Sequence, residues 1–132
     1  MKRSRARREF LLVGLGSVFA GLGIPAALAQ DPAKVMPRAY RVAFENDRLR
    51  VLDFVGRPGM GICGEGMHSH PPHLTIVMAD WQGVVSTPDS APAPRERKFG
   101  DVFWSEAQTH KLENTGKTTA RVLIVEPKTG KA

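Results

Sequence analysis

The sequence contains a single cysteine, Cys63, and this scarcity limits how the fold can be stabilised. One thiol cannot form a disulfide within the chain, so a hydrophobic core, an interface between chains or a bound metal must stabilise it. Cys63 itself has three interpretations: a small buried apolar side chain, a thiol close to a metal, or one half of an intermolecular disulfide.

The chain also lacks an apolar run long enough to span a membrane, because residues 10–24 fall short of the ~20 residues that a span requires. This run follows a basic start and precedes residues 27–29, whose small-x-small pattern is the one that signal peptidases recognise. Arg7 and Arg8, with the apolar residues after them, resemble the twin-arginine export signal of bacteria. We therefore expect residues 1–29 to be a cleaved signal peptide and the protein to be periplasmic or secreted; the alternative is an uncleaved membrane helix.

The positive charge of the chain, +6 at pH 7, is concentrated in this export segment. Residues 1–29 carry five of the 19 basic residues and one of the 13 acidic residues, which leaves residues 30–132 with a net charge of +2. Because export accounts for the basic cluster, the charge gives no support to nucleic-acid binding. We expect neither a nucleic-acid partner nor a stable membrane anchor.

Helical patterns are scarce as well, since no stretch after residue 30 has the amphipathic period of a helix of about ten or more residues. The dominant period is two, which is typical of strands with one buried face. Short strands separated by glycine and proline predict an all-β sandwich or barrel. Strands are expected at residues 40–44, 48–55, from 67, 74–78, 81–86, 100–104, 110–114 and 120–125, with an irregular lead-in at 30–38, a flexible loop at 56–66 and a proline-containing loop at 87–94.

Three of the four histidines, His68, His70 and His73, fall within six residues. Side chains alternate across a strand, so His68 and His70 point to the same face. His110 lies on a later strand and shares the inward parity of Leu112. Three neutral imidazoles can hold one metal ion and leave coordination positions open, as a catalytic or ligand-binding site requires. The alternative is that these histidines are hydrogen-bonded core residues.

Two segments form motif-like patterns: Pro58-Gly59 followed by Met67-His68-Ser69-His70-Pro71, and Gly100-Asp101-Val102-Phe103-Trp104 leading to His110 and Asn114. Together with residues 45–52, they resemble the small single-domain bacterial members of the cupin superfamily, over roughly residues 38–126. The resemblance implies one cupin domain over residues 30–132, folded as a double-stranded β-helix or jelly-roll barrel. It also implies that His68, His70 and His110 bind one divalent transition metal ion.

The sequence departs from the cupin pattern at the glutamate that usually completes the first motif. That position would be Leu74 or Thr75, and neither side chain can replace a carboxylate. His73 precedes it and is either a fourth ligand, if the break at Pro71 and Pro72 turns it inward, or a residue of the rim. A site of imidazoles alone leaves the metal open among Fe, Mn, Zn, Ni and Cu.

The resulting hypothesis is an exported cupin with one metal ion that acts on or binds a small molecule in the barrel. As an enzyme it would be a metal-dependent oxygenase or isomerase. No catalytic residue is identified; Glu106, in the second motif, is either a general base in a mouth loop or an exposed carboxylate. The alternative is a non-catalytic module that binds a small ligand or has a structural role. Because cupins often pair through edge strands, a homodimer is a further expectation.

Overall fold

The computed structural model describes residues 30–59 and 67–129 of the 132-residue chain. The expected signal peptide, residues 1–29, and Cys63 lie outside the described residues. The described part contains no helix that is long and apolar enough to cross a membrane.

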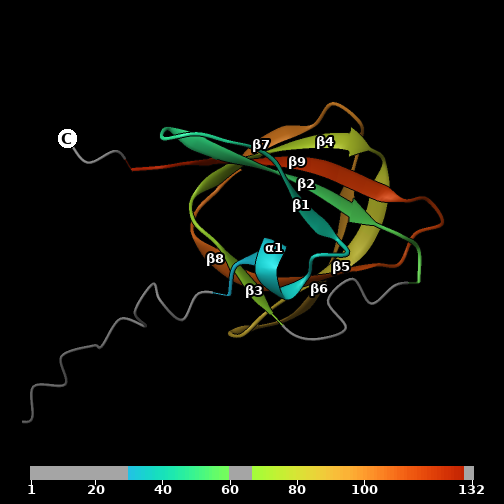
Figure 1. The fold of residues 1–132 in the computed structure, drawn as a ribbon. Helices are drawn as coiled ribbons and strands as arrows, with labels where there is room; N and C mark the ends of the chain where they lie inside the picture. Colours follow the sequence, from blue (N-terminus) through green and yellow to red (C-terminus); the bar gives the residue numbers. More distant parts are fainter. Residues whose placement is uncertain (1–29, 60–66, 130–132) are drawn as a thin grey trace, which may run out of the picture.

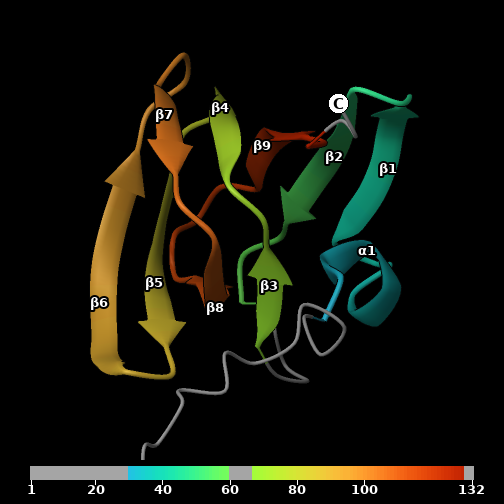
Figure 2. The ribbon, with the colours of Figure 1, turned by 90° about the vertical axis from the view of Figure 1, so that its left-hand side faces the viewer.

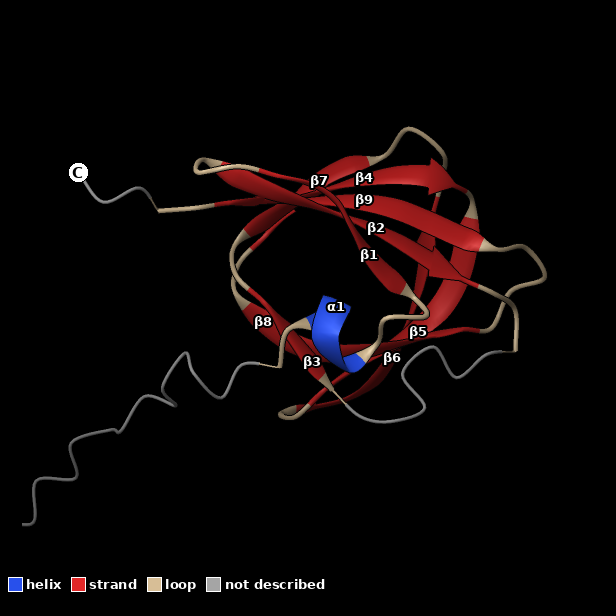
Figure 3. Cartoon of the chain, viewed as in Figure 1, coloured by secondary structure: helices blue, strands red, loops and turns tan. Residues whose placement is uncertain are grey.

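Short strands make up most of the described chain, as the alternating sequence pattern predicts (Figure 3). Each expected strand is present, and its ends differ from the prediction by at most two residues. The elements in chain order are α1 (Pro32–Val35), β1 (Tyr40–Glu45), β2 (Leu49–Gly56), β3 (His68–His70), β4 (His73–Ala79), β5 (Trp81–Thr87), β6 (Ser90–Arg97), β7 (Val102–Ser105), β8 (Gln108–Asn114) and β9 (Ala120–Pro127).

The strands form two antiparallel sheets that curve around one core (Figure 1). The larger sheet has the strand order β1-β2-β9-β4-β7, and the smaller has the order β3-β8-β5-β6. Leu52, Phe54 and Val77 project between the sheets and are each at most 1% exposed. Burial of such a side chain stabilises the fold by about 1.5–3 kcal/mol. The predicted all-β barrel is therefore confirmed.

The prediction of a loop at residues 87–94 is wrong, because most of these residues belong to the strand β6. β6 pairs with β5 and lies at the end of its sheet. Pro92 and Pro94 are two residues apart, so their backbone nitrogens face the same side of the strand. Proline has no N–H to donate, but an edge strand tolerates this because one of its sides has no partner strand. Most β6 side chains are exposed, which explains why no apolar alternation marked this strand in the sequence.

The lead-in, expected to be irregular, contains the single turn of helix α1 near β1 and β3 (Figure 2). Asp31 caps this helix by accepting a hydrogen bond from the Ala33 nitrogen at 3.0 Å, and Pro32 supplies the first helical position, where no N–H is needed. The Gln30 carbonyl accepts a hydrogen bond from the Ser69 nitrogen at 2.9 Å. The lead-in is thereby attached to β3, the strand that carries two of the candidate ligands.

Candidate metal centre

The candidate site lies where β3 pairs with β8. The antiparallel register places His68 opposite His110 and Ser69 opposite Thr109. His68 and His70 face the interior and are 0% and 3% exposed, whereas the hydroxyls of Ser69 and Thr109 form a 2.8 Å hydrogen bond on the exposed side. The strand period thus directs both histidines inward, as expected from the sequence.

Three imidazoles converge at this point. The ring centroid of His68 lies 4.6 Å from that of His110 and 4.9 Å from that of His70. The ring centroids of His70 and His110 are 5.3 Å apart. One nitrogen of each residue lies within 4.8 Å of the others. Chain segments about 40 residues apart in sequence therefore supply one compact set of nitrogen ligands.

The hydrogen bonding of these rings fits a metal ion. The Nδ1 atom of His68 and the Nε2 atom of His70 are buried and have no hydrogen-bond partner in the protein. A buried nitrogen without a partner costs free energy, and a metal ion would satisfy both atoms. The opposite nitrogens are occupied: His68 Nε2 lies 3.0 Å from the Tyr40 hydroxyl, and His70 Nδ1 lies 3.0 Å from Glu126. Such support from a second layer of residues is usual for metal-binding histidines.

The surroundings keep two of these imidazoles neutral, the form that binds metal. Burial, with repulsion from His110 and His70, lowers the pKa of His68 to about 2. Burial, with repulsion from His70 and His73, lowers the pKa of His110 to about 4. At neutral pH both rings therefore retain a free lone pair.

His73 lies beside this cluster on the other sheet, at the start of β4. It is 2% exposed, and its ring centroid is 4.9 Å from that of His70. Its Nδ1 donates a hydrogen bond to the Pro71 carbonyl at 2.8 Å, which leaves Nε2 as its lone-pair nitrogen. Burial is the main cause of its lowered pKa. The converging set consists of the other three histidines, so the fourth-ligand role of His73 stays a prediction.

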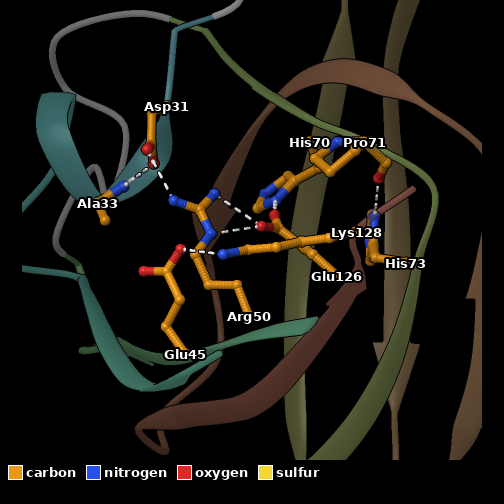
Figure 4. Close-up of polar contacts among 9 residues, drawn as sticks. All are labelled: Asp31, Ala33, Glu45, Arg50, His70, Pro71, His73, Glu126 and Lys128. Carbon is orange, nitrogen blue, oxygen red and sulfur yellow. Dashed lines mark hydrogen bonds and ion pairs between the residues drawn. The ribbon is translucent and has the colours of Figure 1, made fainter. Parts of the chain in front are cut away.

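The sequence interpretation missed a buried carboxylate, Glu126 in β9. Glu126 is 3% exposed; it accepts hydrogen bonds from His70 and, at 2.7 Å, from Nε of Arg50 (Figure 4). Burial alone would raise its pKa, but the hydrogen bonds from His70 and Arg50 outweigh burial and lower it. Arg50 also donates to Asp31 in the lead-in at 2.7 Å.

A signal for Glu126 was present in the sequence. It shares the inward parity of Val122 and Ile124, so a carboxylate occupies a core position of a strand that is otherwise apolar inside. Buried carboxylates are rare unless they are paired, so a glutamate at this position indicates a charged or hydrogen-bonding partner in the interior. Its partner, however, is 56 residues away in sequence, and no local pattern connects the two.

The structure also places Glu106 and the two positions, Leu74 and Thr75, where the motif glutamate would fall. Glu106 is exposed and accepts a hydrogen bond from Nε1 of Trp104, itself an exposed side chain, at 2.8 Å, which agrees with the interpretation as an exposed carboxylate. Thr75 is buried on β4, while Leu74 takes the alternate parity and is only partly buried. No carboxylate occupies the place of the motif glutamate.

The two-sheet fold is similar to a solved cupin domain from Bordetella pertussis Tohama I, with a TM-score of 0.56 and 19% identity over 68% of this chain and 92% of that chain. The chain has the fold of a cupin domain. The predicted double-stranded β-helix is thereby confirmed. At this identity the similarity establishes the fold alone, and the activity must be argued from the site.

Two further cupins are similar to this chain at lower TM-scores. A cupin with a double-stranded β-helix fold from Methanocaldococcus jannaschii has a TM-score of 0.48 and 14% identity, over 67% of this chain and 77% of its own. A cupin-2 domain protein from Shewanella frigidimarina NCIMB 400 has a TM-score of 0.42 and 17% identity, over 68% and 80%. No family model and no curated protein matches the sequence.

Proposed function

We propose that this cupin binds one divalent transition metal ion through His68, His70 and His110 and uses the remaining coordination positions to bind a small molecule. The observation that carries the proposal is the pair of buried nitrogens without partners, His68 Nδ1 and His70 Nε2, in a set of three converging imidazoles. Three protein ligands leave room for a further ligand at the ion, unlike the four of a closed structural site.

The open coordination positions would take a small molecule with an oxygen or nitrogen donor. His68 and His70 are completely or almost completely buried, whereas His110 as a residue is of intermediate burial. We infer that such a molecule approaches the ion from the side of His110. The bound metal would supply a Lewis acid that polarises such a donor.

The hydrogen bonds of Glu126 and Glu106 favour binding of a small molecule without reaction. Glu126 is held by Arg50 and by His70, and this pairing keeps it ionised and immobile. Glu106 is paired with Trp104 at the exposed surface. Both carboxylates are thus already engaged in hydrogen bonds with the protein, which favours binding over proton transfer.

Catalysis as a metal-dependent oxygenase or isomerase is the second candidate. Its support is the open coordination itself, because substrate or oxygen can bind directly to a metal that has only three protein ligands. In this case the metal would perform the chemistry, and the protein would orient the substrate and exclude water.

Export and pairing belong to the same proposal. The basic start, the short apolar run and residues 27–29 support a cleaved twin-arginine-like signal and a periplasmic or secreted location. N-terminal sequencing of the protein exported by a bacterial host tests this, with Gln30 as the expected first residue. The homodimer stays a prediction, which size-exclusion chromatography with light scattering would test.

Metal content and ligand access test the central proposal. Protein purified without chelators is expected to contain about one transition metal ion per chain by elemental analysis. The cobalt-substituted protein should then change its visible spectrum when azide is added, because azide takes an open coordination position. A protein that binds no metal contradicts metal binding, and a cobalt spectrum unaffected by azide contradicts an open site.

A further inference from the structure

The two adjacent histidines of β3 are held by different nitrogens. His68 makes its hydrogen bond through Nε2, to the Tyr40 hydroxyl, and its buried Nδ1 is without a partner. His70 makes its hydrogen bond through Nδ1, to Glu126 Oε1, and its buried Nε2 is without a partner. The nitrogens that remain for an ion are therefore of opposite type in the two residues.

For His70 the protonation follows from its partner. A neutral imidazole carries one N–H and one lone pair, and an ionised carboxylate can only accept hydrogen bonds. Nδ1 of His70 must therefore donate to Glu126, which leaves the lone pair on Nε2. The 2.6 Å ion pair between Glu126 and Nη2 of Arg50 fixes the carboxylate in place.

For His68 the partner is a hydroxyl, which can donate or accept. Tyr40 is 4% exposed and its ring packs against that of Phe54 at 4.8 Å, so the hydroxyl has a fixed position next to Nε2. If the hydroxyl donated, Nδ1–H of His68 would be buried without an acceptor. If Nε2–H donates to the hydroxyl oxygen, the lone pair on Nδ1 is free for an ion, and both nitrogens of His68 are satisfied.

We propose that the metal is bound through Nδ1 of His68 and Nε2 of His70, and that Tyr40 and Glu126 are the positioning residues that set these opposite tautomers. This inference rests on the proposed function, because it specifies how the ion is held. Neither positioning residue belongs to the converging set of ligands. Tyr40 acts through His68, and Glu126 acts through His70.

The tautomers can be observed directly in the zinc-loaded full-length protein labelled with ¹⁵N. The chain has only four histidines, so long-range ¹H–¹⁵N correlation spectra can assign each ring. The expected pattern is a protonated Nε2 in His68 and a protonated Nδ1 in His70. A protonated Nδ1 in both residues would overturn the inference while leaving metal binding intact. Failure of the wild-type protein to bind zinc would instead refute the proposed function itself.

Zinc affinity measured by chelator competition tests the positioning roles. Tyr40→Phe keeps the packed ring and removes the hydroxyl, and we expect roughly 10- to 100-fold weaker binding, the usual effect of losing such a contact. The matched control is Thr109→Val, which removes a hydroxyl hydrogen bond from β8 to the same strand β3, on the exposed face. The control should bind zinc like the wild type.

The same comparison applies to the carboxylate. Glu126→Gln should weaken zinc binding by a similar factor, and Glu113→Gln, at an exposed position of β8, should not change it. Thermal unfolding of the metal-free variants separates positioning from folding. Reduced thermal stability with unchanged zinc affinity in both Tyr40→Phe and Glu126→Gln would show that the two residues are merely structural and would overturn the inference.

Discussion

His68 and His110 are direct cross-strand partners in the antiparallel register of β3 and β8, and their ring centroids are 4.6 Å apart. The register matters because a shift of one residue would turn one of the two rings to the outer face. The exposed hydrogen bond between Ser69 and Thr109, next to this pair, joins the same two strands. The metal centre is therefore a product of strand pairing.

Loss of a converging histidine should remove the metal. His68→Ala and His110→Ala are each expected to reduce metal content from about one ion per chain to a small fraction, because two imidazoles bind a divalent ion far more weakly than three. His73→Ala should have a smaller effect, since His73 lies outside the converging set. Elemental analysis after gel filtration measures this, and equal metal content in all three variants would contradict the assignment.

Metal release on acidification should occur at a lower pH than for ordinary histidines. An ordinary imidazole, with a pKa of about 6.5, gains a proton as the pH falls through that value and then repels the metal. The pKa of His110 is lowered to about 4 and that of His68 to about 2, so these rings stay neutral at pH 5. Metal content measured after dialysis at a series of pH values should therefore show a midpoint of release below pH 6.5. A midpoint of release near pH 6.5 would contradict this.

Asn114, a residue of the second motif, is expected to be essential for stability. It is 1% exposed; its amide nitrogen donates to the carbonyls of Gly56 and Thr118 at 2.8 Å, and its amide oxygen accepts from the Gly116 nitrogen at 3.0 Å. Asn114→Ala should lower the free energy of unfolding by about 2–4 kcal/mol, because buried backbone groups lose their partners. Urea denaturation measures this. The exposed Asn46→Ala serves as the control, and a cost below that of the control would refute the role.

Asp53 should make the stability depend on acid pH. Hydrogen bonds from Arg121 at 3.1 Å and from Arg41 at 2.7 Å lower its pKa despite its burial. The native state then binds fewer protons than the unfolded state, so this contribution is complete above pH ~4 and is lost as the pH falls further. Asp53→Asn should cost about 1–2 kcal/mol at pH 7, a modest value because both arginines are exposed.

The measurement for Asp53 is urea denaturation of wild type and variant at pH 7 and pH 3. The difference in the free energy of unfolding should shrink at pH 3 and also in high salt, which screens the two arginines. A difference that is the same at both pH values would show that the carboxylate charge does not contribute.

Much of the fold was predictable because strand formation leaves a local mark. In β8 the buried Leu112 and Asn114 alternate with the exposed Lys111 and Glu113, and this alternation is visible in the sequence. The strand β6 has no such mark, because its side chains face solvent on an edge and its prolines resemble those of a loop. The site was predictable in the same measure: His68, His70 and His110 each have the inward parity of their strand.

The sequence by itself determined which side chains face inward, since a period of two is a local property of an extended chain. It thereby determined three imidazoles in the core, and it made a β barrel the expected fold. Only the tertiary structure decided which residues hydrogen-bond to these imidazoles: Tyr40 is 28 residues from His68, and Glu126 is 56 residues from His70. Sheet order and register bring these partners into contact, and pairing between distant strands is set by the packing of the whole core.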